Sequence, residues 1–533
     1  MKFAVLSDTH YISQEMLLAG AGEQHVLRSR INRSVMRALA EQTELDTVLI
    51  TGDLTDVGDE LSHREFAGLL RGLQAAGKKV YVLTATHDFY FCRAYSVKYG
   101  WPVKYRMKPW ERPWFDPRTC DFRRLVTDEF AHLSAEECTP PLVKSCTAQE
   151  LWELYRPFGP QQAFSVCESA YSYCVKLEDK LWCLMLNNNF RDVDAVENMS
   201  PGYSPDCYRW IEGLAKQAKE EGAFLFACTH HPLAPPTPAY KIGGGYRNMR
   251  CSLSGHTLAD LGITLVFSGH THFADVAFCS SEAGNVLCNV TTPALAFLPP
   301  AWRTAEIDAA AHTLKLTAVP VEKTPEMNVS EPTLKEHFIN EFIGEYRRKV
   351  SAMPHGLGKA VLGLQVRHLY PLCPRALSKE DYAQIKDMHM FDIIMEMVVN
   401  MQCGDGRFTP DTPVYRFMAA FAAAADSIAA AQPFINVSKL LQGYTVREVI
   451  EPLLFNNYVP DNNAEFVFDR LPEARFETPV YKSYAGEALM GVLSVLAALT
   501  LHAAPALAYA ALPALTVMKK QKLKKNPPQP ERY

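Results

Sequence analysis

The chain has 533 residues, 48% of them hydrophobic, and its formal net charge is −5 at pH 7. This length predicts two or three domains, and the hydrophobic content is high enough to bury their cores, which excludes a largely disordered chain. The slightly acidic balance argues against general nucleic-acid binding, because proteins with that function usually carry a basic domain or stripe.

Short apolar runs alternate with helical stretches in the first part of the chain. Strands are expected at 2–7, 47–51 and 80–84, with amphipathic helices at 27–42 and 62–76 between them. Each strand runs into a polar motif, DTH, GD and THD in turn. The alternation predicts a layered α/β domain, in which ligands bind at the carboxyl ends of the strands.

The pattern changes between residues 89 and 165. This stretch is too long for a plain loop, so we interpret it as an insertion that covers the site. Its aromatic and basic residues could stack a base and hold phosphates: Trp101, Lys104, Arg106, Lys108, Trp110, Arg112 and Trp114. The alternative is a packed excursion without substrate contact, and the sequence leaves both open.

Strand and helix signals return after the insertion. Strands are expected at 171–177, 181–186, 224–228 and 264–267, with a helix at 208–221. The last two strands run into THHP and SGHTH. Alternating segments over 274–321 predict a closing antiparallel sheet, so that this unit ends near Lys323.

The C-terminal part has a different character. Helical spacing in 334–353, 382–401 and 415–431 predicts an α-helical accessory domain over 330–480. Nothing in this region carries a recognisable catalytic motif.

Residues 488–518 contain no Asp, Glu, Lys or Arg, and the basic run KKQKLKK opens the tail 519–533. A bilayer span needs roughly 20 apolar residues, so the length permits one. We expect this segment to be kinked and to lie on or dip into the cytoplasmic leaflet, with the lysines of the following basic run attracted to anionic lipid. The alternative is an apolar helix packed on the accessory domain.

The cysteines and the start of the chain indicate the compartment. The 14 cysteines are scattered singly, with no CxxC pair, so a zinc ribbon or thioredoxin-like site is not expected. The sequence enters a strand pattern at once, without the apolar region of a signal peptide. We therefore expect a protein on the cytoplasmic side of the membrane, with reduced and buried cysteines.

The polar motifs that follow the strands supply metal-binding side chains. Asp8 and His10 are two residues apart, so both can point the same way at a strand end. Asp53 can bridge two cations through its two carboxylate oxygens, and Gly52 leaves room for their close approach. The histidines of the later motifs supply imidazole nitrogen, which suits Zn, Fe or Mn: His230, His270 and His272. Mixed oxygen and nitrogen ligation favours ions that act as Lewis acids.

The joint pattern resembles that of the calcineurin-like metallophosphoesterases, whose motifs are DxH, GDxxD, GNHD or GNHE, an HxP-type histidine and GHxH. Here they read Asp8-Thr9-His10, Gly52-Asp53-Leu54-Thr55-Asp56, Ala85-Thr86-His87-Asp88, His230-His231-Pro232 and Gly269-His270-Thr271-His272. The resemblance covers residues 1–323 and implies a four-layer α/β/β/α sandwich, followed by the helical accessory region. Within the superfamily the layout is similar to cyclic-nucleotide and glycerophosphodiester phosphodiesterases.

The resemblance implies two divalent metal ions. One would be held by Asp8, His10, Asp53 and His272, and the other by Asp53, Thr86, His230 and His270. His87 would face the phosphoryl group as leaving-group acid or transition-state donor, and His231 would be a neighbour that contacts substrate. The family has asparagine where Thr86 stands and glycine where Ala85 stands. Because a threonine hydroxyl is a poorer neutral ligand than an amide carbonyl, we expect a weaker second metal site.

The function implied is hydrolysis of phosphate esters, foremost of a phosphodiester, by a hydroxide that two ions activate. One alternative is a weakly active or inactive scaffold with this fold, which Thr86 and the large accessory region motivate. Another is a phosphomonoesterase or pyrophosphatase that acts on a lipid-linked or nucleotide substrate.

Overall fold

The structure is a computed structural model. It describes residues 1–18, 23–56, 58–89, 94–96, 100–103, 146–188, 202–234, 249–352, 362–430, 445–448, 450–451, 454 and 461–471. Most of the expected insertion, the apolar segment 488–518 and the basic tail 519–533 lie outside these ranges. Within the described ranges, none of the helices combines the length and the hydropathy that a membrane span requires.

Six strands form the first sheet, in the order β15–β14–β13–β1–β2–β3. The parallel half consists of β1 (Lys2–Leu6), β2 (Thr47–Ile50) and β3 (Lys79–Val82). The antiparallel half consists of β13 (Ala301–Asp308), β14 (Thr313–Pro320) and β15 (Asn463–Val467).

Seven strands form the second sheet, in the order β11–β12–β10–β9–β8–β7–β6. They are β6 (Ser165–Cys167), β7 (Ser172–Glu178), β8 (Leu181–Leu186), β9 (Phe224–Thr229), β10 (Leu265–Ser268), β11 (Asp275–Ser280) and β12 (Val286–Thr291). Strands β8, β9, β10 and β12 run parallel, and β7 and β8 form the expected antiparallel hairpin. A separate hairpin joins β4 (Ala94–Ser96) to β5 (Gly100–Val103).

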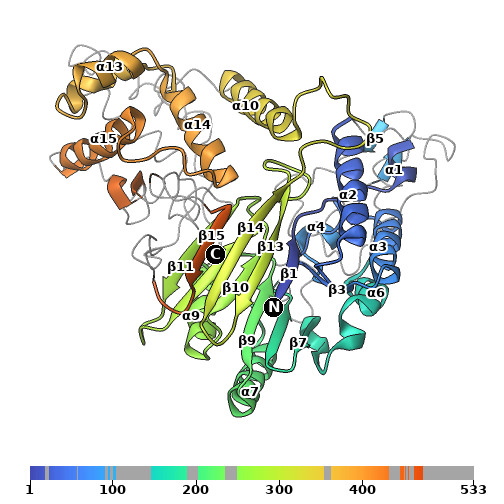
Figure 1. The fold of residues 1–533 in the computed structure, drawn as a ribbon. Coiled ribbons are helices and arrows are strands. Elements are labelled where there is room, and N and C mark those ends of the chain that lie inside the picture. Colours follow the sequence, from blue (N-terminus) through green and yellow to red (C-terminus); the bar gives the residue numbers. More distant parts are fainter. Residues whose placement is uncertain are drawn as a thin grey trace, which may run out of the picture.

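Two helix layers enclose the sheets. Alternate residues of β1 show the arrangement: Phe3 and Val5 pack between the sheets, whereas Ala4 and Leu6 pack against the helices. Helices α2 (Glu23–Glu41) and α3 (Glu60–Ala75) cover the first sheet, and α7 (Pro205–Glu221) and α9 (Met249–Asp260) cover the second (Figure 1). Strands buried on both faces read as continuous apolar runs, which explains their clear signal in the sequence. The predicted four-layer α/β/β/α architecture is confirmed.

Local capping fixes the ends of the outer helices. The Asp59 side chain accepts the N–H of Ser62 at the start of α3, and Ser204 accepts the N–H of Cys207 at the start of α7. These side chains satisfy N–H groups that have no partner inside the helix. Helix α7 ends at Gly222, which adopts the left-handed conformation typical of a helix terminus.

The C-terminal region is mainly helical and has its own apolar core. Its helices are α10 (Leu334–Ala352), α12 (Val366–Leu369), α13 (Lys379–Ile385), α14 (Met390–Cys403) and α15 (Pro413–Ala430). Figure 1 shows α13, α14 and α15 gathered at one end of the sheets. The prediction of a single helix over 382–401 is wrong, because the helix is interrupted: α13 ends at Ile385 and α14 begins at Met390.

Two further expectations are wrong. The range 330–480 is not all helical, because β15 lies within it and pairs with β14 of the first sheet. The alternating segments over 274–321 do not form one closing sheet: β11 and β12 join the second sheet, and β13 and β14 join the first. The period-2 pattern identified these strands correctly, but it carries no information on which sheet each hairpin enters.

The remaining short helices are α1 (Gln14–Leu18), α4 (Thr86–Phe89) and α6 (Ala148–Tyr155), with 3₁₀ turns at Arg156–Phe158, Pro160–Gln162, Glu168–Ala170 and Tyr370–Leu372. The ten cysteines whose side chains the structure describes are buried and carry free thiols, in agreement with the expectation of buried cysteines.

Candidate metal centre

The chemistry-bearing motifs follow five parallel strands taken from both sheets. Asp8 and His10 follow β1, Asp53 follows β2, and Thr86 opens the short helix after β3. The two later histidine motifs follow β9 and β10. Because the carboxyl ends of these strands lie at one edge of the two packed sheets, side chains far apart in the sequence meet there.

The first group of donors contains Asp8, His10 and His272, whose ligand atoms lie within 4.8 Å of one another. Nε2 of His272 is 3.4 Å from Oδ1 of Asp8, and Nε2 of His10 is 3.8 Å from the same oxygen. Two donors about 2.1 Å from one ion lie roughly 3 to 3.5 Å apart, so this spacing suits a divalent cation.

The second group contains Asp53, His230 and His270, again within 4.8 Å. Oδ2 of Asp53 is 3.1 Å from Nε2 of His230 and 3.8 Å from Nε2 of His10. The Asp53 carboxylate therefore lies between the two groups, which is the position expected of a bridging ligand.

Three of these donor atoms are buried and have no hydrogen-bond partner: Asp8 Oδ1, His10 Nε2 and His230 Nε2. An unsatisfied buried polar atom is costly, so three of them directed at one region are the pattern expected of a site that binds a ligand. Carboxylate oxygen and imidazole nitrogen are the donors that Zn, Fe and Mn accept. The residues present therefore fit divalent metal ions.

Hydrogen bonds on the far side of two imidazole rings fix the nitrogen that faces the site. Nδ1 of His10 lies 2.9 Å from Asp56 Oδ1, and Nδ1 of His230 lies 3.0 Å from the Thr51 carbonyl oxygen. A carboxylate and a carbonyl only accept, so each Nδ1 carries a proton, and Nε2 is the nitrogen left to face the other donors of the site.

The backbone around the site is strained. A left-handed conformation is uncommon for residues other than glycine, and five of the candidate ligands adopt it: Asp8, His10, Asp53, His270 and His272, with φ between 42° and 67°. Such strain persists only where the surroundings enforce it, and it concentrates at functional sites. Asp8 and His10 thus converge through a left-handed turn, because β1 ends at Leu6. The alternation of side chains along a strand, which predicts that Asp8 and His10 point the same way, is therefore not the cause of their convergence.

Two glycines permit the close approach of the motif loops. A Cβ atom at Gly52 would lie 2.6 Å from Ala85 Cβ and 2.7 Å from His230 Nδ1. One at Gly269 would lie 1.8 Å from Ser7 Oγ and 2.4 Å from Asp8 Oδ2. Neither position can accept a side chain without moving a candidate ligand or its neighbour.

Charge around the site favours a cation. Burial opposes ionisation of Asp8, but His272, His10 and His230 outweigh it and hold the pKa of Asp8 well below its usual value. Burial also opposes the charged form of His10, yet the carboxylates of Asp56 and Asp8 raise its pKa to about 10. A field that holds a buried imidazolium this strongly also attracts a metal ion.

His270 and His231 form the neutral side of the site. Burial, reinforced by the charge of His230, lowers the pKa of His270 to about 4. Burial likewise holds the pKa of His231 well below its usual value. The His231 ring packs on that of His270, with 4.2 Å between centroids, and its Nδ1 lies 3.3 Å from Asn188 Oδ1. His231 is thus next to the candidate ligands, where substrate contact was predicted.

His87 points into the centre from α4. A ring nitrogen of His87 lies within 4.8 Å of the donor atoms of His10 and Asp53, and its Nδ1 is 2.8 Å from the Asp56 carbonyl oxygen. The backbone N–H of His87 donates to Asp53 Oδ1 over 2.9 Å. Thr86, directly before it, is the first residue of α4. The Asp88 carboxylate accepts the N–H groups of Leu54, Thr55 and Ala85, which ties the motif loops together.

Some residues at the site had little or no sequence signal. Asp56 belongs to the GDLTD motif, but the motif alone does not predict its contact with His10. Asn188 follows strand β8, just as the candidate ligands follow their own strands. Arg28 lies 3.7 Å from the Asp56 carboxylate and 4.0 Å from the centroid of the Phe297 ring. Phe297 packs on His272 and His10, with centroid distances of 4.6 and 4.8 Å. No local pattern marks Arg28 or Phe297.

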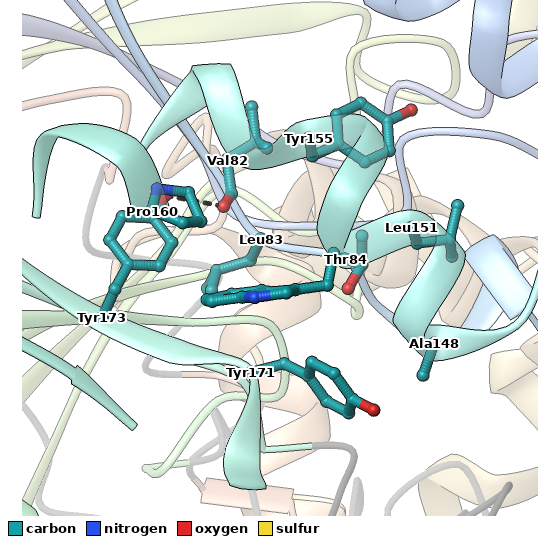
Figure 2. A pocket seen from close by; sticks show the side chains of 10 residues that line it. Val82, Leu83, Thr84, Ala148, Leu151, Tyr155, Pro160, Tyr171 and Tyr173 are labelled. Atoms are coloured by element: carbon teal, nitrogen blue, oxygen red, sulfur yellow. Dashed lines mark hydrogen bonds between the residues drawn. The ribbon is translucent and has the colours of Figure 1, made fainter. Parts of the chain in front are cut away.

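A small aromatic hollow lies beside the loop after β3 (Figure 2). Its lining includes Thr84, Tyr155, Tyr171 and Tyr173, and the Tyr173 hydroxyl donates to the Val82 carbonyl over 2.8 Å. It encloses about 10 Å³, room for about one water molecule, and contains none of the candidate ligands. The side chain of Trp101 and the residues from Lys104 to Trp114 lie outside the described part.

Two solved structures are similar in outline. A dimetal phosphatase from Danio rerio is 12% identical, with a TM-score of 0.35, over 60% of this chain and 96% of that one. A purple acid phosphatase of yellow lupin is 12% identical, with a TM-score of 0.32, over 62% of this chain and 52% of that one. Scores this low support no conclusion about the present chain.

Comparison of sequences is more specific. A probable cyclic nucleotide phosphodiesterase of Rhodopseudomonas palustris is 33% identical over 75 residues, which is 14% of this chain and 26% of that protein. The match thus spans about a quarter of that relative. The family model of the calcineurin-like phosphoesterases matches residues 1–274, which contain every candidate ligand. The chain therefore belongs to the calcineurin-like phosphoesterase family.

Proposed function

We propose that the chain is a phosphodiesterase that uses two divalent metal ions. The observation that carries this proposal is the position of the buried Asp53 carboxylate between two sets of donors. Asp8, His10, Asp53 and His272 would hold one ion, and Asp53, Thr86, His230 and His270 the other. Ions bound there supply Lewis acidity, which polarises a phosphoryl group and brings the pKa of a water molecule to about 7.

The chain itself contributes position and proton control. His10 and His230 present Nε2 in a fixed tautomer, because Asp56 and Thr51 accept from their Nδ1 atoms. His87 is oriented in the same way by the Asp56 carbonyl, so its Nε2 faces the centre. In its doubly protonated form His87 donates from Nε2 to the leaving-group oxygen, and in its neutral form it cannot.

Burial lowers the pKa of His87, while the charge of Asp53 opposes this effect. The doubly protonated ring is then a stronger acid, but a smaller share of His87 carries that proton at neutral pH, so proton donation from His87 should increase as the pH falls. His231 packs beside His270 and would contact the substrate from the side of the second ion.

A diester is the preferred substrate class because the Rhodopseudomonas relative, which matches this chain over 75 residues, is named a probable cyclic nucleotide phosphodiesterase. The test is hydrolysis of bis(p-nitrophenyl) phosphate and p-nitrophenyl phosphate by the full-length protein with Mn²⁺. We expect turnover of the diester and loss of at least about 100-fold in Asp53→Asn. Asp179→Asn removes a carboxylate that is 86% exposed and should leave the rate unchanged.

The alternative is a scaffold with little activity, favoured by Thr86 at a ligand position. It predicts no turnover of either ester with Mn²⁺, Zn²⁺, Fe²⁺ or Ni²⁺, and at most one bound ion per chain by elemental analysis. Faster turnover of the monoester would instead identify a phosphomonoesterase.

Membrane association through 488–518 also stays a prediction, since this segment lies outside the described residues. Fractionation of cells that express the full chain, compared with a chain that ends at Gly486, tests it. If both forms stay in the soluble fraction, the prediction is wrong.

A further inference from the structure

The last turn of α14 contacts the loop that carries two candidate ligands. The backbone N–H of Ala274, two residues after His272, donates to the carbonyl of Gln402 over 3.0 Å. The last four carbonyls of a helix have no partner inside that helix. Here the loop that carries His270 and His272 supplies a hydrogen-bond partner for one of these carbonyls. Both Ala274 and Gln402 are buried.

The end of the helix fits closely against this loop. Gly404 closes α14 in the left-handed conformation, and its N–H bonds to the carbonyls of Asn400 and Met401. A Cβ atom at Gly404 would lie 2.7 Å from the carbonyl oxygen of Ala274 and 3.0 Å from its Cβ. The two backbones therefore touch at a distance that only glycine permits.

The corner Gln402–Asp405 is anchored on its other side to the rest of the molecule. Asn462 donates from Nδ2 to the Cys403 carbonyl over 2.7 Å and leads into β15, which joins the first sheet. The Asp405 carboxylate accepts from Nζ of Lys335 in α10 at 2.8 and 3.0 Å. The corner is thus a fixed support against which the loop rests.

The loop needs such support. His270 and His272 both have a positive φ, which a chain retains only where its surroundings enforce it. On the N-terminal side of the loop, the N–H groups of Gly269 and His270 bond to the His230 carbonyl and to Asp8 Oδ2. On the C-terminal side, the bond from Ala274 to Gln402 closes it.

We propose that the corner Gln402–Asp405 is a positioning element for His270 and His272, so that the C-terminal region completes the metal centre of the phosphoesterase unit. The inference rests on the proposed function in that it takes these histidines as ligands. Residues 1–274, which the family model matches, would on this view bind metal poorly without α14.

The test compares Gly404→Ala with Gly222→Ala in the full-length protein. Both glycines end a helix with nearly the same φ, 63° and 64°, but a Cβ at Gly222 meets nothing within 4 Å. The two changes therefore impose the same backbone strain, and only the first displaces Ala274. Mn²⁺ affinity is measured by calorimetric titration, and exchange of the amides over 269–276 by hydrogen–deuterium mass spectrometry.

We expect Gly404→Ala to bind at least one Mn²⁺ about 10-fold or more weakly and to exchange the loop amides faster. Gly222→Ala should match the wild type in both measurements. Should Gly404→Ala fail to fold, Asn462→Ala removes the bond to Cys403 without adding an atom and should shift both readouts in the same direction. Unchanged affinity and exchange in the folded variants overturn the inference. A wild-type protein that binds no Mn²⁺ overturns the proposed function instead, and the exchange comparison still decides whether the corner holds the loop.

Discussion

Oδ1 of Asp56 lies 2.9 Å from Nδ1 of His10 and turns the opposite nitrogen of that ring toward Asp8 and Asp53. Burial opposes the charge on Asp56, but His10 and Arg28 hold its pKa well below the usual value, so it is a carboxylate. Asp56 therefore fixes the tautomer of His10 and increases its basicity as a ligand.

Replacing Asp56 by asparagine should weaken metal binding without abolishing it. Asparagine retains an oxygen that accepts from Nδ1, but it removes the charge that orients the ring. Outer partners of this kind contribute about 10- to 100-fold to metal affinity, and we expect a loss in that range for Asp56→Asn. Titration with Mn²⁺ measures it, with Asp179→Asn as the control at an exposed position. Equal affinities in the two variants would show that Asp56 does not act through His10.

Gly52 offers a test of packing at the centre. In Gly52→Ala the new Cβ would lie 2.6 Å from Ala85 Cβ and 2.7 Å from His230 Nδ1. Gly77 also has a positive φ, but a Cβ there meets nothing within 4 Å. Gly77→Ala should thus report the backbone strain alone, about 1–2 kcal/mol.

Overpacking costs a further 1–3 kcal/mol, so we expect Gly52→Ala to lower the free energy of unfolding by about 2–5 kcal/mol in total. It should also weaken metal binding, because His230 must move. Urea denaturation of both variants measures the difference. Equal losses of stability would mean that the loops around Gly52 relax freely.

A substitution at Thr86 tests whether the threonine hydroxyl limits the metal affinity of the second site. Thr86→Asn supplies the amide oxygen that the family pattern has at this position, in a residue that directly precedes His87 in α4. We expect tighter binding of the weaker ion, by about 10-fold. Thr147→Asn is the matched control, because Thr147 caps α6 and asparagine caps equally well. If Thr86→Asn leaves the affinity for the more weakly bound ion unchanged, residue 86 does not contact that ion.

The strands that lead to the ligands were predictable, because a buried parallel strand reads as an apolar run and each run here ends in a polar motif. The bounds of β1, β2 and β9 agree with the prediction within one residue at each end. The contact between His10 and Asp56 was not predictable, since it depends on left-handed turns that bring two loops together.

Strand β15 was not found, because a five-residue segment in a helical region gives little periodicity on its own. Its pairing with β14 identifies it, and Phe468, the residue directly after the strand, is buried between the sheets. The support that α14 gives to the loop after His272 was hidden for the same reason. It consists of backbone contacts, and these leave no pattern of side chains in the sequence.

His63 allows a prediction about pH. Its Nε2 donates to the Asp88 carbonyl at 2.7 Å, and its Nδ1 accepts from the Tyr155 hydroxyl at 2.8 Å, so the neutral ring satisfies both partners. Burial lowers the pKa of His63 to about 4, whereas an unfolded chain has about 6.5. Between these values the unfolded state binds a proton that the folded state does not.

The contribution of His63 to stability is therefore complete above pH 6.5 and is lost progressively as the pH falls toward 4. At pH 5 the loss is about 2 kcal/mol. His63→Gln keeps a donor for Asp88 but cannot be protonated, so its stability should fall less between pH 7 and pH 5 than that of the wild type. Urea denaturation at the two pH values measures this difference. His337→Gln changes an exposed histidine and should retain the wild-type slope. If the free energy of unfolding falls equally with pH in the wild type and in His63→Gln, His63 does not titrate in this interval. The buried network with Tyr155 would then not be what holds the ring neutral.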